Sequence, residues 1–208
     1  MKYITFLNKQ GKRAEEKGLE KEAIKLLLLE LSGKSGAEFV SMLHDELPIE
    51  EEERLVKEID KYIIDGIPVQ HIIGYTYFYG YKMKVNKEVL IPRPETEELV
   101  ANVLADIDEY FSDKDEIICA DVGTGSGAIA ITLAKEEPKL RMSASDISFD
   151  ALEVAKKNAE NIGVEINWMQ GDMAQQLVDA QAKAMANAAA ANGWKCACGA
   201  MATGKFCP

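Results

Sequence analysis

The segment that most constrains how this chain folds is Ile117–Gly127, where a carboxylate and three alternating glycines follow a short apolar run. The run has the composition of a strand and leads to Asp121, after which Gly123, Gly125 and Gly127 occupy every second position. The next residues, Ala-Ile-Ala-Ile-Thr-Leu-Ala, have the composition of a buried helix. A strand, a glycine turn and a helix in this order are typical of a nucleotide-type ligand at the carboxyl edge of a parallel sheet.

The spacing of the glycines separates two classes of ligand. Dinucleotide-binding loops have the pattern G-x-G-x-x-G and hold a pyrophosphate at the helix start, whereas this loop reads D-x-G-x-G-x-G. A carboxylate in the turn repels phosphate but attracts an ammonium or sulfonium charge, and S-adenosylmethionine carries both. The loop therefore favours this methyl donor. The alternative is an ordinary glycine turn with surface acids.

Two further acids follow strand-like runs in the order that a donor site requires. Asp146 comes after a run that ends at Met142–Ala144, about 20 residues past the loop, where a ribose-binding carboxylate is expected. Asp172 comes after the run Val164–Met169, and we expect it to lie near an adenine ring. These acids favour a donor site over an ordinary turn.

Residues 1 to about 65 predict a bundle of short helices. Apolar residues share one helical face over Glu20–Leu31, Ser35 is suited to cap the next helix, and Pro48 opens an acidic helix over Ile49–Ile64. In the segment after Ser35, four apolar residues recur at helical spacing: Phe39, Val40, Leu43 and Leu47.

A hairpin and two prolines separate these helices from the glycine loop. The aromatic, alternating runs Tyr75–Tyr79 and Tyr81–Val85 flank a glycine and predict the hairpin. Pro92 and Pro94 then enclose Arg93, which indicates a side chain held in a fixed place. The alternative is a rigid linker between two domains. A helix that runs to about residue 108 is expected to follow.

Charge and hydropathy exclude several classes of protein. The net charge of −11 argues against a broad electrostatic surface for nucleic acid or for an anionic membrane. The longest apolar run, Ile24–Leu31, is interrupted by charges and is too short to span a bilayer, and the amino end lacks the apolar core of a secretory signal. We therefore expect a cytoplasmic protein that binds neither nucleic acid nor membrane directly.

Several of these segments together resemble the peptide chain release factor glutamine methyltransferase family, also called HemK-like. The resemblance covers residues 1 to about 173 and rests on Pro68–Gly74, the Tyr-Phe-Tyr-Gly hairpin, and Ile91–Glu97 ahead of the glycine loop. It implies an α/β protein with an N-terminal helical bundle and a Rossmann-like class I methyltransferase domain. It also implies transfer of a methyl group from S-adenosylmethionine to the glutamine amide of the Gly-Gly-Gln motif in release factors.

The resemblance implies roles for individual residues. Arg93 and Glu95 would shape the methyl-transfer pocket from the linker side. The ribose of the donor would lie at Asp146, and its adenine near Asp172 and Met173. The amino-acid end of the donor would lie along the loop, at Asp121, Gly123, Thr124, Gly125, Ser126 and Gly127.

The chain departs from the family after residue 173. The family carries Asn-Pro-Pro-Tyr at the end of its fourth strand, and this motif does not occur in the 208 residues. An amide nitrogen is a poor nucleophile because its lone pair is delocalised into the carbonyl, so the family motif holds and orients it. We therefore expect an incomplete methyltransferase domain that lacks its C-terminal strands, an open edge at its first strand, and impaired methyl transfer.

The last residues have a different composition. The segment is rich in alanine, and Gln175–Ala191 predicts a helix. Cys196, Cys198 and Cys207 resemble the first part of a zinc ribbon, but zinc in a structural site prefers four ligands, so the metal site would be incomplete. The alternative is reduced, unliganded thiols. We interpret this tail as a fragment of an unrelated protein joined to a truncated member of the family.

We therefore expect four parts in the chain. These are a helical substrate-recognition domain over residues 1–66, a hairpin linker over 67–94, a partial S-adenosylmethionine-binding domain over 95–173, and the tail over 174–208. Two other functions stay open: an amino-methyltransferase that acts on nucleic acid, and a non-catalytic module that binds a partner or a metal.

Overall fold

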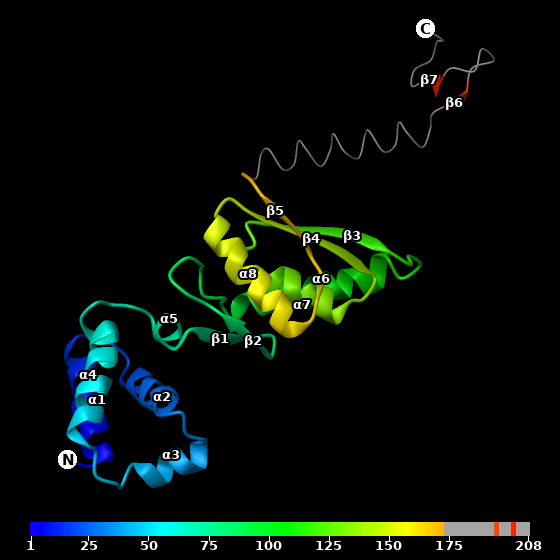
Figure 1. The fold of residues 1–208 in the computed structure, drawn as a ribbon. Coiled ribbons are helices and arrows are strands. Elements are labelled where there is room, and N and C mark those ends of the chain that lie inside the picture. The colour runs from blue at the N-terminus through cyan, green and yellow to red at the C-terminus, as the bar shows by residue number, and fades with distance from the viewer. Residues whose placement is uncertain (173–193, 196–200, 203–208) are drawn as a thin grey trace.

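The computed structural model describes residues 1–172, 194–195 and 201–202. Along the chain these residues form a group of helices, a hairpin and an α/β unit (Figure 1). In the tail, β6 (Trp194–Lys195) pairs antiparallel with β7 (Met201–Ala202). The predicted helix over Gln175–Ala191, the predicted adenine contact Met173 and the predicted metal ligands lie outside the described residues; those ligands are Cys196, Cys198 and Cys207.

The predicted helical bundle is present at the amino end. It consists of α1 (Tyr3–Glu16), α2 (Lys21–Ser32), α3 (Gly36–Met42) and α4 (Ile49–Ile63). The apolar face predicted for the second helix is confirmed, because its central residues have no exposed surface. They share one core with residues of the other helices: Phe6, Ile24, Leu27, Leu28, Phe39, Leu55 and Ile59.

The start of α3 is confirmed, but the apolar face predicted after it is only partly correct. The backbone N–H and the hydroxyl of Ser35 both donate to the Glu38 carboxylate, at 2.9 and 2.7 Å. The helix ends at Met42, and Phe39 and Met42 provide its buried side chains. Val40 is 59 % exposed, because a helix of only two turns presents one narrow stripe to the core.

The α/β unit contains a parallel sheet, as predicted. Its elements are α6 (Glu95–Tyr110), β3 (Ile117–Val122), α7 (Ala128–Glu136), β4 (Leu140–Asp146), α8 (Phe149–Ile162) and β5 (Asn167–Gln170). Both strand pairs are parallel, and the order in the sheet is β3-β4-β5. The second strand extends through Asp146, whereas the third begins at Asn167, later than the predicted run.

The three helices of this unit lie on one face of the sheet (Figure 1). That face buries Leu140, Met142 and Ala144 of the central strand. On the opposite face Ile118 of β3 is 86 % exposed. Within the described residues β3 and β5 are the two edge strands of the sheet. The covered face therefore carries the core of this unit.

The predicted hairpin joins the two parts. It follows α5 (Val69–Ile73) and pairs β1 (Tyr75–Phe78) with β2 (Tyr81–Lys84) around Gly80. Phe78 and Met83 are buried in the core of the α/β unit. Farther along, Val85 and Val89 pack against Ala151 and Val154 of α8, with Ile91 beside them. The linker therefore lies along the first half of α8.

No described helix combines the length and the apolar character needed to cross a membrane.

Candidate functional site

The glycine loop connects the end of β3 to the start of α7 and is tied to the neighbouring strand. Gly123, Gly125 and Gly127 have φ angles of +79°, +56° and +82°, which side chains rarely permit. The backbone N–H groups of Gly123 and Thr124 both donate to the Ser145 carbonyl, at 2.8 and 2.9 Å. The loop is therefore held at the carboxyl edge of the sheet.

Asp146 ends β4 and faces this loop. The Gly125 N–H donates to its Oδ2 at 2.9 Å, and the Ser148 N–H donates to its Oδ1 at 2.9 Å. Each carboxylate oxygen accepts about two hydrogen bonds, so each oxygen of Asp146 can accept one further donor. Such a carboxylate is suited to the two hydroxyl groups of a ribose.

Asp121 lies near the end of β3, the strand that pairs with the strand of Asp146. The Thr124 hydroxyl donates to its Oδ2 at 2.7 Å. Burial raises the pKa of the Asp121 carboxyl, and the negative charge of Asp146 raises this pKa further, while the hydrogen bond from Thr124 lowers it. A buried anion beside a second anion is stabilised by a cation. This environment therefore fits a ligand with a positive charge, as S-adenosylmethionine has.

The pKa of Asp121 leads to a prediction for its replacement by asparagine. Because the folded-state pKa is raised, the folded protein binds a proton more tightly than the unfolded chain does, and stability falls as pH rises through this window. Asparagine does not ionise, so Asp121→Asn should be more stable than the native chain at neutral pH and should bind a cationic ligand more weakly. Urea unfolding from mildly acidic to neutral pH measures the difference. The exposed Asp106→Asn is the control, and an equal pH dependence in all three proteins would contradict the prediction.

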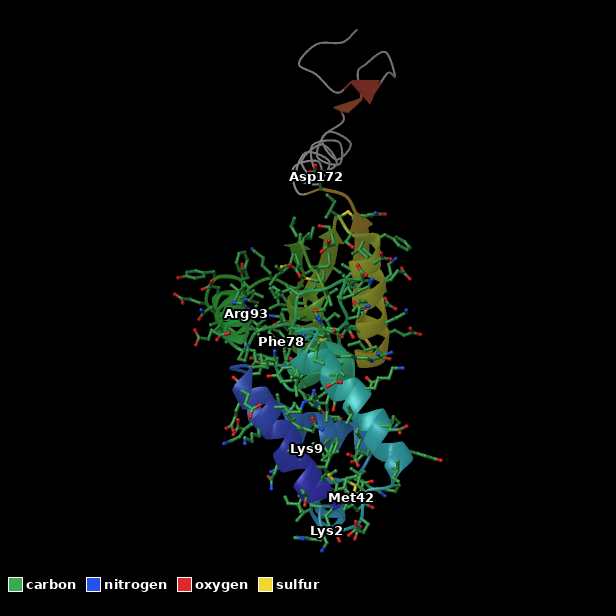
Figure 2. The ribbon with its side chains drawn as sticks, turned by 90° about the vertical axis from the view of Figure 1, so that its left-hand side faces the viewer. Lys2, Lys9, Met42, Phe78, Arg93 and Asp172 are labelled. Atoms are coloured by element: carbon green, nitrogen blue, oxygen red, sulfur yellow. The ribbon has the colours of Figure 1, made fainter. Side chains whose placement is uncertain are left out.

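The end of β5 lies beside Asp146. The Gly171 N–H donates to the Asp146 carbonyl at 3.1 Å, and Gln170 Nε2 donates to the Ile147 carbonyl at 3.3 Å. Asp172 is exposed, and it lies at the end of the α/β unit away from the helices that contain Lys9 and Met42 (Figure 2). Asp121, Asp146 and Asp172 thus come from one edge of the sheet.

Sequence reasoning missed two residues next to Asp146 or the glycine loop. Ile147 follows Asp146 directly and is 71 % exposed, so an apolar surface lies next to the carboxylate. Asn158 of α8 has no exposed surface, and its side chain donates to the Ser126 carbonyl of the loop at 2.9 Å. The signal for Asn158 was its position within the buried stripe of α8: Ala151, Val154, Ala155, Asn158 and Ala159.

Glu95 is the first residue of α6, and Arg93 lies two residues before it. The Thr96 N–H donates to the Arg93 carbonyl at 3.0 Å, and Arg93 lines a hollow of about 450 Å³ together with His71 and Tyr77. Glu95 is exposed. No hydrogen bond or ion pair joins either side chain to the glycine loop within the described residues. A third acid of this segment, Glu97, accepts a hydrogen bond from the Tyr79 N–H at 2.8 Å and so fixes the hairpin to α6.

The described residues contain no group of three or more His, Cys, Asp and Glu side chains that could hold a metal ion. Cys119 of β3 is half-buried, because β3 is an edge strand of the described sheet. This partial burial raises the pKa of its thiol, which keeps it protonated and unreactive.

Both the amino-terminal helices and the α/β unit are similar to parts of known proteins. Residues 6–74 match the family model described as the PrmC N-terminal domain, and residues 102–187 match the methyltransferase small domain. The release factor glutamine methyltransferase of Bacillus subtilis is 42 % identical over 169 residues, which are 81 % of this chain and 58 % of that protein. That of Bacillus cereus is 41 % identical over 159 residues, which are 76 % of this chain and 56 % of that protein.

The chain therefore spans less than two thirds of the length of these curated relatives. Among solved structures, a tRNA (uracil-54, C5)-methyltransferase from Pyrococcus abyssi in complex with S-adenosyl-L-homocysteine matches 47 % of this chain and 23 % of that protein. The two are 19 % identical with a TM-score of 0.38, a likeness too low to bear on function.

Proposed function

Because the chain belongs to the release factor glutamine methyltransferase family, we propose that it binds S-adenosylmethionine at the carboxyl edge of β3 and β4. The observation that carries this proposal is the arrangement around Asp146, whose two oxygens face the N–H groups of Gly125 and Ser148 at 2.9 Å. A carboxylate fixed in this way beside a glycine loop presents its remaining acceptor positions to the ribose hydroxyls.

The other residues of the edge fit the remaining parts of the donor. Asp121 pairs with the cationic amino-acid end, because its carboxylate is largely buried beside Asp146 and gains from a positive neighbour. Gly123 and Gly125 border open space, since a Cβ built at either position meets no atom within 4 Å, and this lets the ligand approach the backbone. Ile147 offers its exposed apolar surface to the adenine, and Asp172 offers an acceptor at the end of β5.

The proposed reaction is methylation of a release factor. When bound, S-adenosylmethionine would supply a methyl group on a positively charged sulfur. The carbon–sulfur bond would break as the side-chain amide nitrogen of a glutamine bonds to the methyl carbon, so that the thioether S-adenosylhomocysteine leaves and the nitrogen loses one proton. The names of the relatives from Bacillus subtilis and Bacillus cereus support this acceptor class. We further propose that residues 1–66 recognise the release factor, that 67–94 link the parts, and that 95–173 bind the donor. In this arrangement Arg93 and Glu95 shape, from the linker side, the pocket in which the methyl group is transferred.

The 208 residues hold the donor loop and its acids, but no Asn-Pro-Pro-Tyr to orient the amide. An unoriented amide nitrogen rarely adopts the in-line geometry that attack on the methyl carbon requires. We therefore propose that this stretch of chain, on its own, binds the donor and transfers the methyl group poorly or not at all.

Calorimetric titration of the chain with S-adenosylmethionine tests donor binding. We expect saturable binding that Asp146→Ala removes, because the substitution deletes the acceptors for Gly125, for Ser148 and for the ribose. Asp150→Ala is the matched control, since Asp150 is an exposed acid in the first turn of α8 and should leave binding unchanged. Absence of binding by the native chain would contradict the donor site. Detectable methylation of a release factor by the native chain would contradict the proposed loss of transfer.

A further inference from the structure

The buried stripe of α8 contains one side chain that connects two distant segments. Asn158 Nδ2 donates to the Lys84 carbonyl at 3.0 Å and to the Ser126 carbonyl at 2.9 Å, and its Oδ1 accepts from the Lys84 N–H at 2.7 Å. Lys84 ends β2 of the hairpin, and Ser126 belongs to the glycine loop. One side chain thus links the linker hairpin to the candidate donor loop.

Only a primary amide of this length provides the groups that the position requires. Its two N–H groups serve two carbonyls and its oxygen serves one N–H, so each of the three backbone groups has a partner. The two bonds to Lys84 occupy both backbone groups of that residue, as a neighbouring strand would. An aspartate would retain the acceptor but would leave the Lys84 and Ser126 carbonyls without donors, and would add a buried charge.

The Asn158 side chain can reach the Ser126 carbonyl because α7 and α8 approach each other closely at the loop. A Cβ built on Gly127 would lie 3.1 Å from the Ala155 Cβ, one turn before Asn158. Ser126 lies between Gly127 and Gly125, and the Gly125 N–H donates to Asp146. The hydrogen bond from Asn158 therefore acts next to the residues that set the position of the proposed ribose-binding carboxylate.

We propose that Asn158 is a positioning residue that fixes the donor loop against the hairpin, so that donor affinity depends on where the hairpin lies. This inference rests on the proposed donor site. It implies reciprocity: a partner that docks on the hairpin side and shifts β2 changes donor affinity, and donor binding changes partner affinity by the same factor.

The first experiment compares Asn158→Asp with Val154→Ala. Val154 is a buried apolar residue of the same helix, and its truncation destabilises the fold while leaving the hydrogen bonds of Asn158 to Lys84 and Ser126 in place. We expect Asn158→Asp to weaken binding of S-adenosylmethionine about tenfold or more, since two hydrogen bonds are lost. Val154→Ala should lower the thermal midpoint while leaving affinity within about twofold at temperatures where the protein is folded. Equal affinities of the two variants would show that Asn158 is only structural.

The second experiment reaches the loop from the hairpin. Lys84→Pro removes the N–H that donates to Asn158, whereas Lys84→Ala keeps the backbone group and removes only the side chain. We expect the proline variant to weaken donor binding and the alanine variant to leave it unchanged. In an Asn158→Ala background, which lacks all three hydrogen bonds, the proline should have no further effect on donor binding, because the link is already broken. An undiminished effect of the proline there would overturn the proposed connection.

Failure of the donor site and failure of this inference give different results. If the native chain does not bind S-adenosylmethionine, the proposed function fails. Amide hydrogen exchange of the loop still tests whether Asn158 positions the loop. Exchange at Gly123, Thr124 and Gly125 should be faster in Asn158→Asp than in Val154→Ala, because these N–H groups hold the loop to β4. If exchange is equal in the two variants, Asn158 does not position the loop.

Discussion

Replacing Gly127 by alanine is expected to lower the free energy of unfolding of the α/β unit by about 2–5 kcal/mol and to remove donor binding. Gly127 has a φ angle of +82°, and a Cβ there would lie 2.7 Å from Ile131 Cδ1 and 3.1 Å from the Ala155 Cβ. The end of the Ile131 side chain is flexible in principle, but Ile131 has no exposed surface and so little room to move. The backbone strain and the overlap therefore add up at this position.

Gly125→Ala is the matched control for this prediction. Gly125 also has a positive φ angle, of +56°, but a Cβ built on it meets no atom within 4 Å. Only the conformational cost of about 1–2 kcal/mol remains. Urea unfolding of the two variants separates the two contributions. If they lose the same stability, close packing of α7 on α8 is not the reason for the glycine at position 127.

Replacing Phe6 by alanine is expected to destabilise the amino-terminal bundle by about 3–5 kcal/mol. The Phe6 side chain has no exposed surface and lies in a core that contains Ile24, Leu28 and Leu55. A cavity left by a phenylalanine in such a core is seldom filled by relaxation of its neighbours. Phe6→Leu retains most of the volume and should lose clearly less stability.

This second prediction also tests the proposed division of the chain. The core around Phe6 contains residues of α1 to α5, whereas the residues proposed to bind the donor lie between Asp121 and Asp172. We therefore expect Phe6→Ala to leave the affinity for S-adenosylmethionine unchanged while a separate unfolding transition moves to lower temperature. A parallel loss of donor affinity would show that the bundle and the donor unit do not fold independently.

The sequence predicted the elements that have strong local signals. The pattern around Asp121 predicted a strand, a turn and a helix, because glycines permit the positive φ angles that a tight turn requires. Ser35, Pro48 and the glycine of the hairpin mark ends or turns for similar local reasons. Asp146 was predicted as a ribose-binding carboxylate because it follows a strand-like run about 20 residues past the loop, and it is the last residue of β4.

The remaining features depend on residues far apart in the chain. Asn158 contacts Lys84 and Ser126, which are 74 and 32 residues away, and no local pattern indicates such partners. The half-burial of Cys119 depends on which strands flank β3, which its own composition does not encode. The hollow at Arg93 is lined by α5, the hairpin and the linker together. The two prolines predicted a side chain held in a fixed place, but no local pattern indicates which distant residues surround it.

The one-sided cover of the described sheet has a consequence for synthesis on the ribosome. The core of the α/β unit draws its buried side chains from Phe78 to Ala159, a continuous stretch, and the strands β3 to β5 are added to the sheet in the order in which they are translated. A nascent chain can therefore close this core before any later segment has emerged. The exposed face around Ile118 would be the surface that such an early intermediate presents to the rest of the chain or to a chaperone.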